Sequence, residues 1–427
     1  MFPVKYVRDN LEMVRVAAQR KRVKVDWRLF EELEERRRTL IQLIEEQKHR
    51  HNLLTGEIAK KKREGVDVKA LLEEGREVSS RIRKEEEGLS ETEKALNELI
   101  SAIPNIPHAS VPIGENASEN VVVRQWGEIS RNSVTAVPHY EFGERLGILQ
   151  LDRGAKITGS FFPAFAGSGA RLVRGLINYM IDLHVSNGFS EVWVPALVNR
   201  KSLFGTGQLP SLESDMYWLQ EDDFFLIPTA EVPVTNLLRD EILEEANLPR
   251  RYCAYTPCFR REAGAYGKDT RGLVRLHQFD KVEMVSFSHP ETSYEDLEFL
   301  VTEAEKVLQG LHLPYRVIEL CTADLSFAAA KCYDLEVWAP GIERWLEVSS
   351  CSNFEGFQAR RANIRFRGKK GKTDFLHTLN GSGLALPRVI IAILENFQTE
   401  KGSLSIPEVL QPYMGGMSEI LDPEDLF

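Results

Sequence analysis

Residues 27–103 contain no proline, and glutamate, lysine, arginine and leucine dominate them. Apolar residues recur along this segment at seven-residue spacing, at Leu33, Leu40 and Leu54 in its first half and at Ile82, Leu89, Leu96 and Ile103 in its second. The polar Gln47 takes the remaining place in the first half, and Val78 and Leu99 fit the companion apolar track. Sustained seven-residue repeats with charged flanks are typical of coiled coils. We therefore expect two long helices that pack along a shared seam.

The periodicity fails between the two halves, in the sequence KKKREGVD at 60–67, where Gly65 supplies a turn. The simplest closure is an antiparallel helical hairpin, which would reach about 50 Å from its base at roughly 1.5 Å per residue. The basic residues 60–63 at the tip suit phosphate groups, which would make the hairpin a probe for a distant partner. However, glutamate is about as frequent as lysine and arginine together in residues 27–103, and mixed charge usually marks a solvated face. The residues of the hairpin alone therefore favour a dimerisation element or a spacer.

Two prolines, at 104 and 107, end the helical region and stiffen the link that follows. We expect an N-terminal domain of residues 1–105 and a second domain of residues 106–427. The second domain mixes an amphipathic helix over 170–184, a short strand over 191–195, and paired strands over 251–262 and 275–286 around a polar loop. These patterns predict an α+β domain with a mainly antiparallel sheet. Neither G-x-x-x-x-G-K-[ST] nor a strand-linked G-x-G-x-x-G is present, so a P-loop and a dinucleotide fold are both unsupported.

The formal charge of −10 argues against a general nucleic-acid coat protein, which would be basic. No apolar run is long enough to span a bilayer, and the first residues lack the apolar core of a secretion signal. The five cysteines are scattered and show no C-x-x-C spacing. We therefore expect a reduced, cytoplasmic protein without a disulfide framework, a zinc site or a membrane segment.

Two arginine-bearing segments lie about a hundred residues apart. The first is CFRRE at 258–262, followed after a polar, glycine-rich loop by RLHQF at 275–279, and the second is NGSGLALPR at 380–388, which opens an apolar helix. An unpaired charge buried beside an apolar helix is very costly, so these arginines need partners. Phosphate groups suit the planar, permanently charged guanidinium group. Together the two segments predict a nucleotide site.

These segments resemble motifs of the class II aminoacyl-tRNA synthetases. Arg260, Glu262, Arg275 and Phe279 resemble their motif 2, residues 381–388 resemble motif 3, and the expected helix from Ala170 with the strand ending at Pro195 resembles motif 1. Five further segments are similar to those of seryl-tRNA synthetases: TGQLP at 206–210, PTAEVP at 228–233, DTRG at 269–272, HQFDKVE at 277–283 and EVSSCSN at 347–353. The similarity runs from the first residues through the hairpin to PYMGG at 412–416. So many motifs in one order make the resemblance specific to that family.

The resemblance implies a catalytic domain built on an antiparallel sheet flanked by helices, and it implies serine–tRNA ligase activity. The carboxylate of serine would attack the α-phosphate of ATP, and the resulting seryl-adenylate would pass serine to the 3′ end of tRNA(Ser). Such chemistry depends on positioning and on neutralising phosphate charge more than on a protein base. The implied cofactor is Mg²⁺ bound with ATP, and no zinc is expected.

The resemblance implies ATP contacts from motif 2, motif 3 and the segment between them: Arg260, Arg261, Glu262, Arg275, Phe279, Glu347, Val348, Ser349, Ser350 and Arg388. Arg260 would grip the α-phosphate, Phe279 would lie against the adenine, and Arg388 would cover its other face and approach the γ-phosphate. Glu262 would receive the adenine amino group, and it completes the implied catalytic set with Arg260 and Arg388. Glu347 and Ser350 would hold the magnesium ion, which prefers oxygen ligands.

The residues implied to bind serine are Thr229, Ala230, Glu231, Arg260, Glu283, Asn380 and Ser382. The ammonium group would lie near Thr229 and Glu231, and the hydroxyl group near Glu283 and Ser382. Plainer interpretations exist, because Thr229 with the nearby Glu231 would also suit a helix N-terminus and Ser382 would suit the N-cap of the helix that follows. Tyr266 departs from the small residues and arginine of many motif 2 loops, and would alter how this loop meets ATP or tRNA.

The resemblance reverses the interpretation of the hairpin, which would grip the long extra arm of tRNA(Ser) and would serve tRNA(Sec) as well. It also implies a homodimer whose interface is formed by motif 1 around Pro195. Two rival classes are disfavoured by the sequence. A non-catalytic paralogue would have lost some of Arg260, Glu262, Glu347 and Arg388, and a ligase that charges a carrier protein would lack the hairpin.

Overall fold

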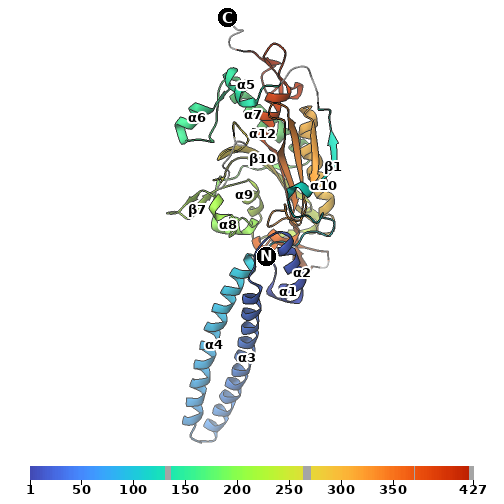
Figure 1. Cartoon of the computed structure of the whole chain (residues 1–427). Coiled ribbons are helices and arrows are strands. Elements are labelled where there is room, and N and C mark those ends of the chain that lie inside the picture. Colours follow the sequence, from blue (N-terminus) through green and yellow to red (C-terminus); the bar gives the residue numbers. More distant parts are fainter. Residues whose placement is uncertain (130–135, 263–270, 370, 423–427) are drawn as a thin grey trace. The chain divides into compact units, whose positions relative to one another are not determined.

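The structure of the chain is a computed structural model, which describes residues 1–129, 136–262, 271–369 and 371–422. It divides into two compact units, Met1–Pro104 and Asn105–Phe427. The regular elements of the first unit are helices, and the second unit combines helices with strands (Figure 1). Within the described residues, no helix is both long enough and apolar enough to cross a membrane.

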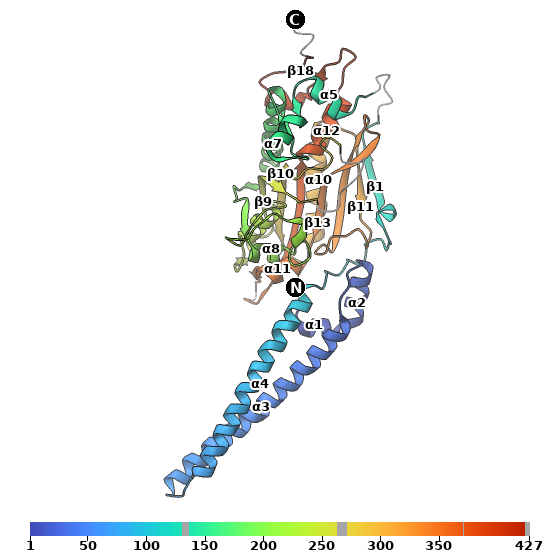
Figure 2. The ribbon, with the colours of Figure 1, turned by 60° about the vertical axis from the view of Figure 1, so that its left-hand side comes forward.

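The first unit contains two short helices, α1 (Val4–Asp9) and α2 (Leu11–Arg20), and two long ones, α3 (Trp27–Arg63) and α4 (Lys69–Ser101). The long helices lie side by side as an antiparallel pair (Figures 1 and 2). Asp26 caps α3 by accepting a hydrogen bond from Leu29 N at 3.0 Å. Gly65 has a φ of 72° in the turn between α3 and α4, a conformation that glycine adopts without strain. The predicted hairpin is therefore confirmed.

The seam of the hairpin follows the predicted register. Buried or half-buried along it are Leu33, Leu40, Gln47, Leu54, Val78, Ile82, Leu89, Leu96, Leu99 and Ile103. Ion pairs flank the seam, with Arg37 Nε 3.0 Å from Glu93 Oε1 and Lys48 Nζ 2.7 Å from Glu86 Oε1. Exposed pairs of this kind contribute about 0–1 kcal/mol each, so the apolar seam is the main source of stability in the hairpin.

The second unit is built on a mainly antiparallel sheet, as predicted. Among the described residues, eight strands follow the spatial order β1-β11-β12-β13-β16-β10-β9-β4. Their bounds are β1 Val121–Trp126, β4 Ser190–Glu191, β9 Arg250–Phe259, β10 Gln278–Ser288, β11 Tyr315–Glu319, β12 Lys331–Ala339, β13 Arg344–Asn353 and β16 His377–Ala385. Neighbouring strands run antiparallel except β4, which pairs in parallel with β9.

The two faces of β10 meet different cores, because successive side chains of a strand point to opposite faces. Val282 and Met284 enter a large apolar core shared with α7 (Ser168–Ser186), α10 (Ser293–Gly310) and α12 (Leu386–Asn396). Val285 and Phe287 enter a second core shared with α9 (Glu231–Asn236) and α11 (Gly356–Ala362). Glu283, Lys281 and Phe279 also have odd numbers, so their side chains lie on the same face of β10 as Val285 and Phe287.

The remaining helices are α5 His139–Arg145, α6 Leu151–Thr158 and α8 Arg200–Thr206, with short 3₁₀ turns at Ala117–Glu119, Glu213–Asp215, Glu245–Asn247 and Glu408–Leu410. The remaining strands are β2 Leu149–Gln150, β3 Ala164–Phe165, β5 Leu197–Asn199, β6 Trp218–Leu219, β7 Phe224–Leu226, β8 Ile242–Glu244, β14 Arg365–Arg367, β15 Thr373–Phe375, β17 Leu404–Ser405 and β18 Glu419–Ile420.

Three local predictions can be compared directly with these bounds. The predicted helix over 170–184 is α7, and the predicted strand pair is β9–β10, in which Phe259 lies opposite Gln278. The strand expected over 191–195 is shorter than predicted: β4 ends at Glu191, and beyond it Val192 N donates one further hydrogen bond to Cys253 O at 2.9 Å. Pro195, which has no N–H group, cannot extend the ladder.

The interpretation of Ser382 as a helix N-cap is wrong. Ser382 lies inside β16, and α12 begins only at Leu386, with Ala385 at the N-cap position. Pro387 occupies the first turn of α12, where the absence of an N–H group has no cost. The strand therefore continues further into the 380–388 segment than the sequence suggested.

Candidate active site

A cavity of about 820 Å³ opens over the odd-numbered face of β10. Twelve of the residues expected to bind ATP or serine line it: Thr229, Glu231, Arg260, Glu262, Arg275, Phe279, Glu347, Val348, Ser350, Asn380, Ser382 and Arg388. They come from β10, β13 and β16, from the segments that follow β9 and precede β10, and from the starts of α9 and α12. The sheet thus brings the two arginine-bearing segments of the sequence to one cavity.

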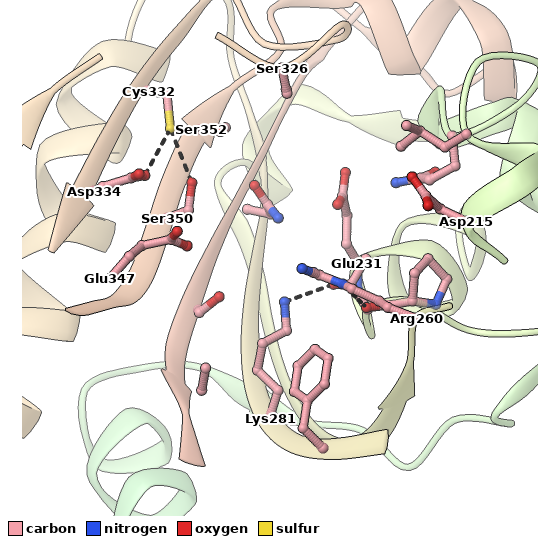
Figure 3. A pocket seen from close by; sticks show the side chains of 18 of the residues that line it. Asp215, Glu231, Arg260, Lys281, Ser326, Cys332, Asp334, Glu347, Ser350 and Ser352 are labelled. Carbon is pink, nitrogen blue, oxygen red and sulfur yellow. Dashed lines mark hydrogen bonds between the residues drawn. The ribbon is translucent and has the colours of Figure 1, made fainter. Parts of the chain in front are cut away.

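Arg260 lies just beyond the end of β9. Its Nε donates a hydrogen bond to Pro228 O at 3.3 Å, and its guanidinium carbon lies 5.2 Å from the centre of the Phe279 ring. Figure 3 shows Arg260 and Glu231 pointing into the same part of the cavity. The guanidinium group therefore lies between the Phe279 ring and the Glu231 side chain. Its positive charge faces any ligand bound in the cavity.

A second arginine, Arg275, also lines the cavity. Arg275 Nη1 pairs with Glu262 Oε2 at 2.8 Å. Glu262 has a φ of 49°, a left-handed conformation that is uncommon for a residue with a side chain. The ion pair and the unusual backbone conformation both fix where the Glu262 carboxylate points.

The strands β12 and β13 supply acidic and hydroxyl groups to the opposite wall. Arg388 Nη1 donates to Glu347 O at 2.7 Å and lies 3.4 Å from Glu347 Oε2. Asp334 pairs with Ser350 across the two strands. Burial and the nearby Glu347 carboxylate raise the pKa of Asp334 well above its usual range. The Asp334 and Glu347 carboxylates repel each other when both are ionised, and a cation bound beside them would reduce that repulsion.

A buried network joins β10 to the loop before α9. Glu283 Oε2 accepts from Thr229 Oγ1 at 3.0 Å and pairs with Lys281 Nζ, while Glu283 Oε1 accepts from Asn380 Nδ2 at 3.0 Å. Lys281 Nζ also donates to Thr229 Oγ1 at 3.0 Å. Every group in this set is therefore committed to a defined partner, so the surface that it presents to a ligand is fixed before the ligand arrives.

Glu231 begins α9, and its backbone N donates to Thr229 Oγ1 at 3.2 Å. The expectation that a helix starts in this segment is confirmed, but the N-cap residue is Ala230, which has no side-chain cap, and not Thr229. The Glu231 side chain is buried, and Gln358 Nε2 donates to its Oε1 at 2.6 Å. Burial and the Glu283 carboxylate raise the pKa of Glu231 to about 7, although the Gln358 hydrogen bond and the charges of Lys281 and Arg260 oppose the rise. Glu231 is thus an acid poised to titrate near neutral pH.

Four of the expected residues do not line the cavity. Ala230 is fully buried in the second core, and Glu283 lies one layer beneath the cavity wall, where Thr229 and Asn380 bond to it. Ser349 is buried, and its Oγ donates to Ser382 O at 2.6 Å. The Arg261 guanidinium carbon lies 5.5 Å from the Tyr217 ring centre. Tyr266 and residues 269–270 of the motif 2 loop lie outside the described residues.

Three side chains near the cavity were not singled out from the sequence. Lys281 alternates along β10 with Phe279 and Glu283, so the two-residue period of a strand would have found it. Asp334 is brought to the cavity by its pairing with Ser350, and Gln358 by the packing of α11; no local pattern indicates either contact. Both depend on contacts between distant segments.

The cysteines are buried thiols. All five lie in the described part of the chain and are free and buried. Burial raises the pKa of Cys253 and of Cys351 to about 12. At neutral pH these groups remain protonated and make poor nucleophiles.

Comparison with known proteins matches each of the two units to a domain model of tRNA synthetases. Residues 1–107 match the model of the seryl-tRNA synthetase N-terminal domain, and residues 217–397 match the model of the class II tRNA synthetase core domain (G, H, P, S and T). The chain is 52% identical over 421 residues to the serine–tRNA ligase of Pelotomaculum thermopropionicum, covering 98% of this chain and 100% of that one. It is also 52% identical over 422 residues to the serine–tRNA ligase of Geobacter sulfurreducens, with 98% and 100% covered.

Solved structures agree with these sequence matches. Seryl-tRNA synthetase from Pyrococcus horikoshii, determined in complex with ATP, is similar with a TM-score of 0.94 and 36% identity, covering 99% of this chain and 100% of that one. Cytoplasmic serine–tRNA ligase from Naegleria fowleri, determined in complex with AMP, is similar with a TM-score of 0.88 and 28% identity, with 99% of both chains covered.

Proposed function

We propose how the cavity works from the premise that this chain belongs to the seryl-tRNA synthetase family of class II ligases and is a serine–tRNA ligase. The cavity would take ATP and L-serine together, with the serine carboxylate directed at the α-phosphate. Attack would form seryl-adenylate and release pyrophosphate. A hydroxyl group of the terminal ribose of tRNA(Ser) would then attack the acyl carbonyl and release AMP.

The observation that carries this proposal is the position of Arg260 between Phe279 and Glu231. A guanidinium group there would reach the α-phosphate while the amino acid lies against Glu231. Negative charge builds on the α-phosphate as the reaction proceeds, and a preorganised cation in a partly enclosed site stabilises it strongly. We assign Arg260 this role, with Arg388 and Glu262 as the other members of the catalytic set.

The nucleotide would lie along the wall formed by motifs 2 and 3. Phe279 would stack against the adenine, with Arg388 on its other face and near the γ-phosphate. Glu262, oriented by Arg275, would receive the adenine amino group. Arg261, Val348 and Ser349 complete the proposed ATP contacts. The Pyrococcus horikoshii relative determined with ATP supports a nucleotide in a fold of this kind.

We assign Mg²⁺ to Glu347 and Ser350. Their oxygen atoms are donors of the kind that magnesium prefers. The raised pKa of the neighbouring Asp334, which Glu347 helps to cause, supports a cation beside these acids. When bound, the ion would neutralise charge on the ATP phosphates. Glu347 would hold the ion, and Arg388, which bonds to the Glu347 carbonyl, would keep that strand in place.

Serine would be recognised at both ends. Its ammonium group would pair with Glu231 beside Thr229 and Ala230, and its hydroxyl group would bond within the network of Glu283, Asn380 and Ser382. A site built to hydrogen-bond a hydroxyl group rejects an analogue without one, because its buried polar groups then stay unpaired. Alanine would therefore be excluded without an additional editing site.

The first unit would bind the RNA. We propose that residues 1–105 form the tRNA-binding domain and that the hairpin grips the long extra arm of tRNA(Ser), and of tRNA(Sec) in the same manner. The charged residues 60–64 at the tip are mostly exposed, so their side chains are open to phosphate groups. Local phosphate contacts and shape would serve an acidic protein in place of a general basic surface.

We further propose that the chain works in the cytoplasm as a homodimer joined through motif 1. Trp193, which follows β4, is 83% exposed, and Val185 and Leu197 are also exposed at 43% and 44%. We propose that these side chains contribute to one apolar patch, which is typical of a protein interface. Burial against a second copy would remove them from water.

Aminoacylation of unfractionated bacterial tRNA with labelled serine, ATP and Mg²⁺ tests the proposal. Charging of long-armed tRNAs alone, identified by hybridisation, is the expected result, with threonine and alanine as control amino acids. Charging of other tRNAs, or equal use of alanine, would contradict the proposed recognition of both substrates.

A further inference from the structure

The helix α11 supplies a buried amide to the floor of the serine subsite. Gln358 is fully buried, and its Nε2 donates to Glu231 Oε1 at 2.6 Å and to Thr206 O at 3.1 Å. Thr378 Oγ1 donates to Gln358 Oε1 at 2.7 Å. Because the oxygen end of the amide is bonded to the Thr378 hydroxyl group, the NH₂ end is directed at the Glu231 carboxylate. A carboxylate that accepts such a bond is held in one orientation.

Arg361, one turn further along α11, bonds to the same part of the chain as Gln358, at the end of α8. Its Nη1 donates to Phe204 O at 3.2 Å and to Leu209 O at 3.1 Å. Its guanidinium group is surrounded by three aromatic rings, with 4.6 Å to Phe204, 5.6 Å to Phe327 and 4.7 Å to Phe357. The two side chains of α11 therefore bond to the carbonyl groups of residues 204, 206 and 209. These belong to the last turn of α8 and the residues just after it, a segment called the loop below.

That loop forms part of the cavity wall, through Thr206, Gly207 and Gln208. Gly207 has a φ of 92°, and a Cβ atom there would lie 3.2 Å from Ala328 Cβ. The loop is thus closely fitted to its surroundings, and it shares Gln358 with Glu231. A shift of α11 would move the loop and the Glu231 carboxylate together.

We propose that Gln358 is a positioning residue for amino-acid recognition, which orients the Glu231 carboxylate toward the serine ammonium group while Arg361 holds the adjoining loop. The inference rests on the proposed role of Glu231 as the ammonium ligand. Neither Gln358 nor Arg361 belongs to the residues that contact substrate in the proposed site. Their effect reaches serine through Glu231 and the loop.

The charged groups around Glu231 make the proposed role of Gln358 visible in the pH dependence of serine binding. Glu283 and Lys281 face it from β10, Arg260 faces it from the segment after β9, and Gln358 bonds to it from α11. The pKa of Glu231 is raised to about 7 by burial and by Glu283, and the Gln358 hydrogen bond opposes that rise. Loss of the bond raises the pKa further, so the carboxylate that binds an ammonium group forms only at higher pH.

The test uses Gln358→Met in the full chain, which removes all three side-chain hydrogen bonds, to Glu231, Thr206 and Thr378, at similar volume. Steady-state pyrophosphate exchange should show KM for serine raised about 10- to 100-fold, the range for losing a hydrogen bond to a charged group. KM for ATP should stay near the wild-type value, and the acid limb of kcat/KM for serine should move to higher pH. Gln398→Met is the matched control, because the Gln398 amide also bonds to backbone groups, at Val137 and Leu394, away from the cavity.

Thr378→Val is a milder second variant, since it removes only the hydroxyl group that orients the amide. It should raise KM for serine less than Gln358→Met does, with the same selectivity. Unchanged KM for serine in both variants would overturn the inference, and so would an equal rise of KM for ATP and serine, which indicates general distortion. Glu231→Gln distinguishes the proposed role of Glu231 from that of Gln358. If Glu231→Gln leaves serine binding unchanged, the proposed role of Glu231 is wrong. If Glu231→Gln impairs serine binding but Gln358→Met and Thr378→Val do not, only the inference about Gln358 fails.

Discussion

Lys281→Met removes the ammonium group that pairs with the Glu283 carboxylate beneath the cavity. The Lys281 side chain is 7% exposed and the Glu283 side chain 0%, so water cannot replace the lost partner. Removing one member of a buried ion pair costs roughly 3–5 kcal/mol of folding free energy, because the other charge stays buried without its counter-charge. For a unit as large as Asn105–Phe427, at the lower end of about 2–4 °C per kcal/mol, the melting temperature should fall by roughly 6–10 °C.

The assay is thermal unfolding at one scan rate, followed by circular dichroism. Arg367→Met is the control, because Arg367 pairs with Glu244 at 2.9 Å where both side chains are more than half exposed, at 51% and 57%. That loss should stay below about 1 kcal/mol. The double variant Lys281→Met/Glu283→Gln should recover much of the stability, since neither charge is then left alone. A Lys281→Met protein that melts no lower than the control, or a double variant less stable than Lys281→Met, would refute the reasoning.

Three further predictions concern activity. Arg260→Ala should lower serine-dependent pyrophosphate exchange by about 100-fold or more, because charge on the α-phosphate loses its partner, while filter binding of tRNA stays unchanged; near-normal exchange would contradict the assigned role. Deletion of residues 26–103, bridged by a short glycine-serine linker, should preserve exchange and abolish charging, and a variant that still charges tRNA would show that the hairpin is dispensable. With the pKa of Glu231 raised to about 7, the carboxylate fraction declines as the pH drops below 7. Accordingly, kcat/KM for serine should fall toward pH 6 while kcat/KM for ATP changes little, and Glu231→Gln should lose this acid limb; a limb that persists in Glu231→Gln belongs to another group.

The features that the sequence predicted well are those with local causes. The hairpin follows from a seven-residue apolar repeat and from Gly65, whose φ of 72° fits the expected turn. The β9–β10 pair follows from two apolar runs around a polar loop, and α12 follows from a continuous apolar stretch. In each case, neighbouring residues alone determine the element.

The features that sequence analysis missed depend on distant partners. Gln358 acquires its position only because α11 packs against α8 and β16, and Asp334 only because β12 pairs with β13. The N-cap prediction for Ser382 is wrong for a related reason. The strand that contains Ser382 pairs with β10 and β13 on either side, and this pairing extends β16 beyond the predicted start of the helix. Tertiary pairing decides such positions.

The strand order of the sheet has a consequence for synthesis of the chain. β1 pairs with β11, as in Val121 opposite Glu319, so the edge strand VVVRQW is complete almost two hundred residues before its partner leaves the ribosome. At about 5–20 residues per second, that interval lasts roughly 10–40 s. During this time three consecutive valines have no strand to pair with, whereas α3 meets α4 within a few seconds. The nascent chain therefore exposes an unpaired apolar strand after both helices of the hairpin have been made, and unpaired apolar strands are prone to aggregate.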